Sequence, residues 1–504
     1  MPRPYPHEHA LFSLRPYNGN ELARRIIDHP NNSHNVSLCD GIPALDVGFH
    51  LRRNSSSTLA ELGRHQHADI YLDGAHFSRT QCSFEIVVDT GVIMLHDRSS
   101  GGTTQCHASD GDDAAPFQYG RAQRKVLVQK DFNTVIGMGG TWNDLLQFEL
   151  EWHRTPAETA EAIRKYNAQG YDVVENPRLA TTRPATPPGR SAPIRCLRVH
   201  KLGSGSFGTV HKAIDVDSGE AMAVKTIKRP TGEQQQAKWE KMLEREVEIL
   251  RKTKHSHIVE YIWAQVQGTG VAIFMSLKEG NLQSLIERGD HKPGIIADSV
   301  LPQMLQALDC IASNRIVHRD VKPENILYVT DRNDQSGFRF QLGDFGFAKS
   351  IADPASVAGT YIFMPPELFQ GGSNTTKLDV WSLFVTMMWT LDTQGFRQNQ
   401  NYYQSQPATV VQGLVRLVAS PGGELSRIQR MAMFDPDHRA SAAEMLVDLF
   451  PGIPLSNPQH AVPHTPIAPV EAPNPAPYAL TPPVTRSKTR EMQRNAAAAQ
   501  HHVE

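Results

Sequence analysis

The stretch that decides the fold of this chain reads Ile316-Val317-His318-Arg319-Asp320-Val321-Lys322-Pro323-Glu324-Asn325. Phosphoryl transfer asks little covalent chemistry of a protein, which must instead hold an acceptor hydroxyl, a polyphosphate and metal ions in line. Here Asp320 can accept the proton of the hydroxyl, Asn325 can reach a metal ion, and Lys322 can neutralise charge on the moving phosphoryl group. A single loop aspartate is usually a turn or capping residue, but ten residues in this order favour the chemical interpretation.

Length and composition set the outer bounds of the fold. The 504 residues are enough for two or three domains, and 34 prolines with 36 glycines predict linkers or tails. The net charge of -2 argues against a protein that coats nucleic acid. The chain has no apolar run of about eighteen residues and no apolar signal-peptide core. We therefore expect an intracellular protein of the cytoplasm or nucleus, with no membrane and no direct nucleic-acid partner. Five cysteines without pairing or metal-ligand spacing predict no disulfide and no zinc site.

A glycine-rich pattern, Gly203-Ser204-Gly205-Ser206-Phe207-Gly208, lies between two β-type runs. The pattern alone is weak evidence, because a dinucleotide-binding fold would use it at a turn from strand to helix. Here a strand continues through Val210, which predicts a hairpin whose backbone covers nucleotide phosphates. The following strand ends in Lys225, whose ammonium group is placed to bind those phosphates.

The helix expected over residues 236–252 carries an acidic residue on an apolar face. Leu243, Glu246 and Leu250 follow one another at three- and four-residue spacing and so share a face. A carboxylate on such a face is costly unless it is paired, so we expect an ion pair between Glu246 and Lys225. The alternative is a solvated glutamate in a charged segment.

Together these motifs resemble the protein kinase family over residues 196–453, and Lys322 is the version found in Ser/Thr kinases. The resemblance implies a bilobal α+β fold that binds ATP with Mg²⁺ or Mn²⁺ and phosphorylates protein Ser/Thr hydroxyls. It also implies that Phe345 packs with His318 and Leu250, and that Glu367 pairs with Arg439. The implied catalytic residues are Asp320, Lys322, Lys225, Glu246 and Thr360; the metal ligands are Asn325 and Asp344; and the nucleotide-binding residues are Leu202, Gly203, Gly205, Gly208, Val210, Ala223, Lys225 and Met275, with Met275 limiting the depth of the adenine pocket.

The loop from Asp344 to Glu367 predicts how activity is controlled. Arg319 precedes the catalytic aspartate, and an arginine there usually waits for a phosphate on this loop. Thr360 is expected to bond Asp320 and to be structural. Ser356 is therefore the first phosphosite candidate and Ser350 the second, with autophosphorylation in trans through a transient dimer.

Residues 10–153 break into short β-prone runs separated by turn residues, a spacing typical of a sandwich or barrel. Gly63-Arg64, Ser78-Arg79-Thr80-Gln81 and Asp97-Arg98-Ser99-Ser100-Gly101 together resemble the forkhead-associated (FHA) domain, a β-sandwich that binds phosphothreonine proteins. The resemblance implies that Arg64 and Ser78 hold the phosphate, that Arg79 adds charge and that Ser100 touches the peptide. The chain has Gln81 and Gly101 where the family has His and Asn. The alternative is a β-sandwich kept only for docking.

A proline-rich linker over residues 154–195, with one helix-like piece at 156–168, separates the two domains, and residues 454–504 read as a disordered Pro-rich and basic tail. The sequence thus predicts a multidomain protein, an FHA-like β-sandwich followed by a kinase, in an order that resembles the checkpoint kinases of the DNA-damage response. The alternative function is an ATP-binding pseudokinase scaffold that recruits phosphoproteins.

Overall fold

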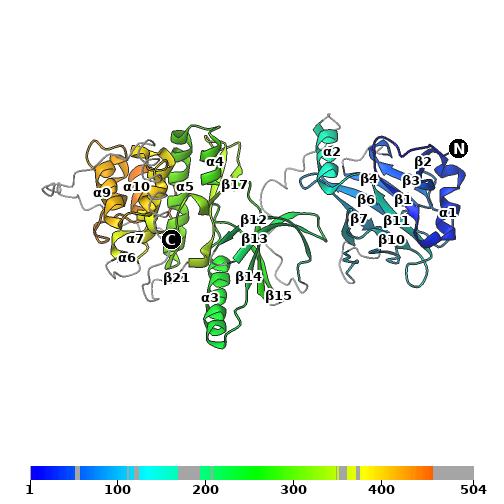
Figure 1. Ribbon diagram of the computed structural model, residues 1–504, viewed down its shortest axis with the longest axis horizontal. Coiled ribbons are helices and arrows are strands. Elements are labelled where there is room, and N and C mark those ends of the chain that lie inside the picture. Colours follow the sequence, from blue (N-terminus) through cyan, green and yellow to red (C-terminus); the bar gives the residue numbers. More distant parts are fainter. Residues whose placement is uncertain are drawn as a thin grey trace, which may run out of the picture. The chain divides into compact units, whose positions relative to one another are not determined.

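The structure is a computed structural model that describes residues 2–51, 57–109, 113–118, 124–168, 193–205, 208–268, 270–347, 349–350, 360–369 and 375–457 (Figure 1). Residues Met1–Ala461 form one compact unit. Its buried apolar side chains gather mainly in two clusters, one built on the strands of the N-terminal part and one on the helices of the C-terminal part.

The N-terminal part consists of two sheets. One sheet has the strand order β2-β3-β1-β11-β10-β8 and the other β5-β4-β6-β7-β9, with β4 and β5 parallel and all other neighbours antiparallel. The rings of Phe12 in the first sheet and Phe84 in the second meet edge to face at 4.9 Å, so the two sheets share a core. The strands are β1 (Ala10–Pro16), β2 (Val36–Cys39), β3 (Ile42–Gly48), β4 (Thr58–Gly63), β5 (Ile70–Tyr71), β6 (Cys82–Val87), β7 (Val92–Asp97), β8 (Thr104–His107), β9 (Lys125–Val128), β10 (Val135–Met138) and β11 (Leu146–Trp152). A β-rich N-terminal region is therefore confirmed.

Two α-helices accompany these sheets. The helix α1 (Glu21–Ile27) begins at Asn20, whose side chain accepts a hydrogen bond from the amide of Ala23 and so caps the first turn. The helix α2 (Pro156–Ala168) covers the turn between β6 and β7, where a Cβ on Gly91 would lie 2.6 Å from Ala160. The helix expected at 156–168 is thus present, and only a glycine fits beneath it.

The kinase-like N-lobe is a five-stranded antiparallel sheet with one long helix. The strand order is β12-β13-β14-β16-β15, and the register places Val210 opposite Lys225 and Ala223 opposite Met275. The elements are β12 (Cys196–Gly205), β13 (Gly208–Asp215), β14 (Ala221–Lys228), α3 (Glu233–Lys252), β15 (Tyr261–Gln267) and β16 (Gly270–Ser276). The glycine-rich pattern lies at the β12–β13 connection, which agrees with the expected hairpin.

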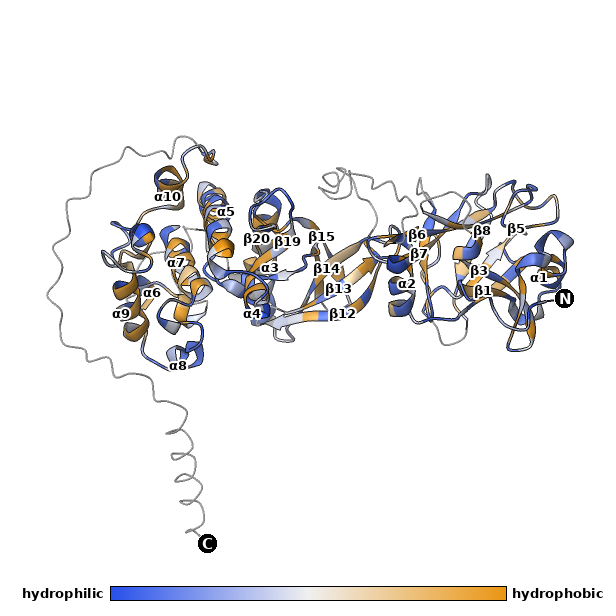
Figure 2. Ribbon diagram, turned by 90° about the horizontal axis from the view of Figure 1, so that it is seen from above, coloured by the Kyte–Doolittle hydropathy of each residue, from blue (hydrophilic) through white to orange (hydrophobic). Residues whose placement is uncertain are grey.

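The C-lobe is helical and is built around α5 (Pro293–Ser313) and α7 (Lys377–Leu391). The helix α7 is buried from Leu378 to Thr390 and is largely apolar, as its colouring in Figure 2 shows, whereas α5 is buried mainly from Ser299 to Ile311. By length and composition α5 could cross a membrane, but 72% of that segment is buried inside the lobe, which is the position of a core helix. The other elements are β17 (Gly280–Asn281), α4 (Leu282–Arg288), β18 (Ile316–Val317), β19 (Ile326–Thr330), β20 (Phe338–Leu342), β21 (Lys349–Ser350), α6 (Pro366–Phe369), α8 (Gln400–Gln404), α9 (Ala408–Ala419) and α10 (Ala442–Leu449).

Candidate active site

The catalytic loop that follows β18 is fixed from behind by a buried carboxylate. The Asp379 side chain, from α7, accepts hydrogen bonds from the backbone amides of His318 and Arg319, each at 2.7 Å. Asp379 is 1% exposed, and burial raises the pKa of its carboxyl. Arg319 has a φ of 73°, a left-handed conformation that a long side chain rarely adopts without support. Asp379 is therefore a positioning residue that the sequence-based prediction did not include.

Four of the predicted catalytic and metal-binding residues meet around the Asp320 carboxylate. Oδ1 accepts hydrogen bonds from the amide and the hydroxyl of Thr360, both at 3.0 Å. Oδ2 lies 2.9 Å from Lys322 Nζ and accepts a hydrogen bond from Asn325 Nδ2 at 2.9 Å. Lys322 Nζ also donates to the Thr360 hydroxyl at 2.7 Å. The arrangement points Asp320 and Lys322 toward the same small volume, where an acceptor hydroxyl and a transferred phosphoryl group would meet.

Opposite this cluster, Lys225 and Asp344 form an ion pair of 2.9 Å between Nζ and Oδ1. Burial alone would raise the pKa of the Asp344 carboxyl, but the Lys225 ammonium holds that pKa below its ordinary value. Asp344 has a φ of 58° and so is held in a left-handed conformation like Arg319. Glu246 lies on α3 as expected, but its side chain is outside the described part of the chain, so its pairing with Lys225 stays a prediction.

The residues expected to bind nucleotide line the β12–β13 hairpin and the inner strands. Gly208 has a φ of 135°, and a Cβ there would lie 2.2 Å from the carbonyl oxygen of Thr226. Only glycine therefore allows the hairpin to approach β14 so closely. Leu202, Gly203 and Gly205 lie on β12, Val210 on β13, Ala223 and Lys225 on β14, and Met275 on β16.

The donor set fits a nucleotide with a divalent cation. An oxygen pair from Asn325 and Asp344 suits Mg²⁺, which keeps few protein ligands and takes the rest from phosphate and water. Among the described residues there is no group of three or more His, Cys, Asp or Glu side chains that would hold a metal by itself.

Two further predicted contacts are present in the C-lobe. The rings of His318 and Phe345 meet edge to face at 4.8 Å, and Phe345 is 2% exposed. Arg439 forms a two-pronged ion pair with Glu367, with distances of 2.6 and 2.9 Å. Both side chains of that pair are buried, which makes its geometry specific. The pair anchors the end of the loop that carries Thr360.

The loop between Asp344 and Glu367 is described only at its ends. Ser350 is part of β21, which pairs with β18, but its side chain is outside the described residues. Ser356 lies entirely outside them. Both remain candidate phosphosites.

In the N-terminal part, the four residues expected to bind a phosphopeptide lie on loops that touch one another. The amide of Arg64 donates to the carbonyl of Ser78 at 3.1 Å, and the amide of Ser100 donates to the Ser78 hydroxyl at 3.4 Å. The amide of His65 donates to the carbonyl of Arg79 at 3.3 Å. Arg64, Arg79 and Ser100 are exposed, whereas Ser78 is half-buried.

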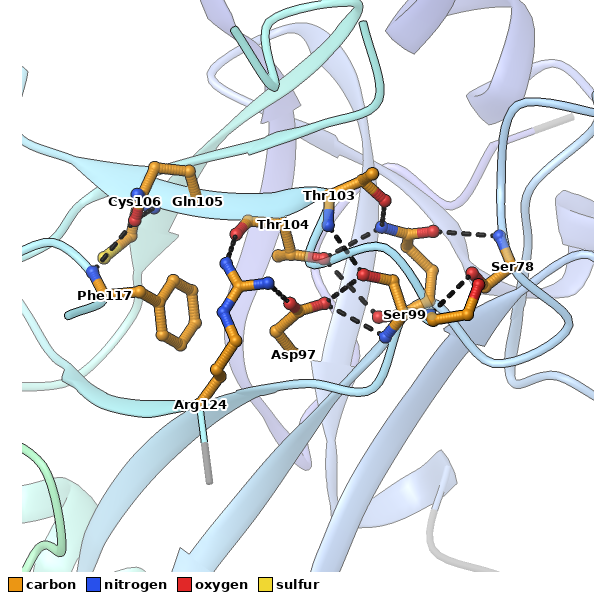
Figure 3. A network of polar contacts seen from close by, with 11 residues as sticks. Ser78, Asp97, Ser99, Thr103, Thr104, Gln105, Cys106, Phe117 and Arg124 are labelled. Atoms are coloured by element: carbon orange, nitrogen blue, oxygen red, sulfur yellow. Dashed lines mark hydrogen bonds and ion pairs between the residues drawn. The ribbon is translucent and has the colours of Figure 1, made fainter. Parts of the chain in front are cut away.

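Buried Gln81 ties these loops together. Its Oε1 accepts from the amide of Ser78 at 2.9 Å, and its Nε2 donates to the hydroxyls of Thr103 and Thr104, each at 2.9 Å. Figure 3 shows the surrounding network, in which the Asp97 carboxylate accepts from the amide and hydroxyl of Ser99 and pairs with Arg124. The amide group of Gln81 therefore holds the loop of Ser78 against Thr103 and Thr104. Gly101 has no side chain with which to bind a peptide.

A comparison with known proteins covers the C-terminal part. A family model described as the protein kinase domain matches residues 197–450. The serine/threonine-protein kinase TIO of Arabidopsis thaliana is 33% identical over 196 residues, 38% of this chain and 14% of that protein. The serine/threonine-protein kinase PAK 1 of Mus musculus is 31% identical over 51% of this chain and 47% of that protein, and the mitogen-activated protein kinase kinase kinase 2 of Arabidopsis thaliana is 31% identical over 40% and 33%. The chain spans less than half the length of these relatives, and the family model does not extend to residues 10–153.

Proposed function

Because the chain belongs to the protein kinase family, we propose that it is a Ser/Thr protein kinase that transfers the γ-phosphoryl group of ATP to protein hydroxyls. The observation that carries this proposal is the cluster in which Asp320, Lys322, Asn325 and Thr360 meet, with the Lys225–Asp344 pair opposite. The relatives named as serine/threonine kinases support the choice of acceptor.

Each residue has a definite task in this reaction. The Asp320 carboxylate accepts the proton of the acceptor hydroxyl, and Lys322 neutralises charge on the transferred group. Lys225 binds the α and β phosphates, and Asn325 and Asp344 would hold the divalent cation. When bound, that cation would supply positive charge to the polyphosphate. Lys225 and Asp344 lie 2.9 Å apart, so each charged group helps to hold the other in place.

A phosphotransfer assay with Mg-ATP, labelled in the γ position, and a Ser/Thr peptide library tests the proposal. Wild-type protein should label peptides, and Asp320→Asn should lower the rate by about 10²–10⁴-fold because the proton acceptor is lost. Wild-type protein that binds ATP but transfers no more phosphate than Asp320→Asn would favour the alternative, a pseudokinase scaffold.

For the N-terminal domain we propose recognition of phosphothreonine proteins. The convergence of Arg64, Ser78, Arg79 and Ser100 on adjoining loops supports this function, because phosphate capture needs guanidinium, hydroxyl and backbone donors on rigid loops. Its order before the kinase resembles checkpoint kinases, so we also propose a role in intracellular signalling of that type.

A fluorescence titration with a phosphothreonine peptide library and its unphosphorylated counterpart tests this second function. Arg64→Ala and Ser78→Ala should each weaken only the phosphorylated form, since a charge-assisted hydrogen bond contributes about 1.5–3 kcal/mol. His67→Ala, on the same loop as Arg64, serves as the control. Equal affinity for both peptide forms would reduce the domain to a docking sandwich.

A further inference from the structure

The second sheet of the N-terminal part carries a group of apolar side chains on its outer face, next to the turn between β6 and β7. An antiparallel sheet usually turns one face to the core and the other to water. Here Phe84 and Ile86 point to the core, whereas alternate positions on β6, β7 and β9 belong to the opposite face. That outer face carries Val87, Val92, Met94 and Leu127, and the last two are 1% and 0% exposed.

The side chains that cover this face come from the kinase N-lobe. Ile214, near the end of β13, and Val216, just after that strand, are 6% and 2% exposed and belong to the same apolar cluster as Met94 and Leu127. The turn that follows lies so close that a Cβ on Gly219 would be 2.7 Å from a methyl of Val87. Gly219 also has a φ of 74°, so glycine is required there on two counts.

Hydrogen bonds fix the orientation of the two parts at this apolar contact. The strand β9 lies at the edge of its sheet, and edge strands leave amides without a partner strand. The carbonyl of Val216 accepts a hydrogen bond from the amide of Leu127 at 2.8 Å, which pairs this edge. The hydroxyl of Thr90 donates to the carbonyl of Gly219 at 2.8 Å on the other side of the turn.

Polar groups at the rim hold the turn in shape. The Asp215 carboxylate accepts hydrogen bonds from the amides of Asp217 and Ser218, at 2.8 and 3.1 Å, so the turn is ordered by its own residues. Arg195 pairs with Asp217 and also donates to the carbonyl of Pro116 in the β domain, both at 2.5 Å. An apolar centre with a hydrogen-bonded rim is the pattern of a specific interface.

We propose that residues 214–219 of the kinase N-lobe are the built-in partner of this outer face, within one chain, and that the β domain and the N-lobe act as one structural unit. The strand β13 begins at Gly208 of the glycine-rich hairpin and ends in the interface, so docking restrains the element that covers the nucleotide. The loops with Arg64, Ser78 and Ser100 lie at the other ends of β4, β6 and β7, so docking leaves them open to a phosphoprotein.

Amide hydrogen exchange on the full chain tests the interface. Val216→Asp places a carboxylate against Met94 and Leu127, and we expect the Leu127 amide to exchange at least about tenfold faster than in wild type. Val266→Asp is the matched control. Val266 lies on β15 of the N-lobe sheet and is 81% exposed, so this change should leave the exchange rate of the Leu127 amide unchanged. Met94→Lys places a charge in the same interface from the side of the β domain. This second variant tests the proposal if Val216→Asp fails to fold. Equal Leu127 exchange in wild type and in a folded interface variant would overturn the proposal.

Cleavage of the connecting segment gives an independent readout. A full chain with a specific protease site inserted in residues 169–192 should, after cutting, run on size exclusion as one complex of the two fragments at micromolar concentration, with the mass of a single chain. The Val266→Asp fragments should also stay together, whereas those of Val216→Asp or Met94→Lys should separate. Wild-type fragments that separate, or a cut complex with twice the mass of one chain, would contradict docking within one chain.

Discussion

At the scale of single residues, the site combines strained backbone with long-range support. Arg319 and Asp344 have positive φ values of 73° and 58°, which cost free energy unless neighbouring groups hold them. Asp379 supplies that hold for Arg319 from 60 residues away, and Lys225 supplies it for Asp344 from 119 residues away.

Asp344→Ala should remove metal-dependent phosphotransfer while leaving the fold intact, because it deletes a ligand on a preformed loop. The variant also removes the Asp344 carboxylate from Lys225. Lys225→Met is therefore the companion change, and it should lose activity because the phosphates lose their ammonium partner. Phosphotransfer rates over a magnesium series and circular dichroism spectra measure activity and fold together. An Asp344→Ala variant with the wild-type rate would show that the metal lies elsewhere.

His50 should make the N-terminal part sensitive to mild acid. Its ring stacks on His7 with centroids 4.1 Å apart, and burial lowers the pKa of His50 to about 4. Because the folded pKa lies below the unfolded value of about 6.5, the unfolded state binds protons first. His50 therefore stabilises the fold above about pH 6.5, and that contribution is lost as pH falls toward 4.

Urea unfolding of wild type and His50→Gln at pH 7.5 and pH 5 measures this effect. Wild type should lose on the order of 1–2 kcal/mol more than the variant over that interval. His34→Gln is the control, because His34 is exposed on the short 3₁₀ helix Pro30–Asn35. Identical pH dependence in wild type and His50→Gln would rule out this contribution.

At the scale of elements, the sequence predicted the motif-bearing parts well and the plain β strands less well. The β12–β13 hairpin and α3 occur where the residue pattern placed them, because each carries a chemical motif or a clear apolar spacing. The strand that carries Lys225 is also present, but it continues to Lys228 instead of ending at Lys225. The hairpin of β2 and β3 was missed, although Asp40-Gly41, with φ values of 52° and 78°, is a strong turn signal. The strand β2 has only four residues and β3 includes Pro43, so the alternation of the hairpin is weak.

The same contrast applies to positioning residues. Asp320 could be named from its ten-residue neighbourhood, whereas Asp379 could not, because its role depends on α7 packing behind the catalytic loop. Gln81 was identified as a departure from a family pattern, but the two threonines that it bonds were not predicted, since they lie on the loop and strand that follow β7. Neighbouring residues in the sequence identify the catalytic side chains, whereas the residues that position them are known only once the packing of distant elements is seen.

The loop from Asp344 to Glu367 is expected to switch activity on when it is phosphorylated. We expect autophosphorylation at Ser356, with Ser350 second, because a phosphate there could reach Arg319 and order the loop by charge-assisted bonds. Ser356→Ala should lower the phosphotransfer rate, and Ser356→Asp should restore part of it. Phosphosite mapping by mass spectrometry, before and after incubation with ATP, checks the position. Full activity in a chain with no phosphate on this loop would refute the switch.

At the scale of the whole molecule, two cores meet at a surface that composition could not reveal. Residues 197–450 match one family model, yet Ile214 and Val216 from within that range complete the apolar cluster of the N-terminal sheets. A domain boundary drawn from motifs alone would separate them. Deletion of the N-terminal part should therefore expose apolar side chains on the kinase N-lobe, and a chain that begins near residue 195 should be less stable than the full chain.

Nucleotide binding should stabilise the full chain by mass action, whether the chain is an active kinase or a pseudokinase scaffold. Mg-ATP at a hundredfold excess over its Kd should add about 2.7 kcal/mol to the free energy of unfolding, measured as a rise in Tm by differential scanning fluorimetry. Lys225→Met should reduce the shift because the phosphates lose their ammonium partner, whereas Asp320→Asn should keep it because that carboxylate acts on the acceptor hydroxyl. A full shift with no phosphotransfer in wild type would identify a nucleotide-binding scaffold. If Mg-ATP and Mn-ATP produce no shift well above millimolar concentration, the chain lacks a nucleotide site of either kind.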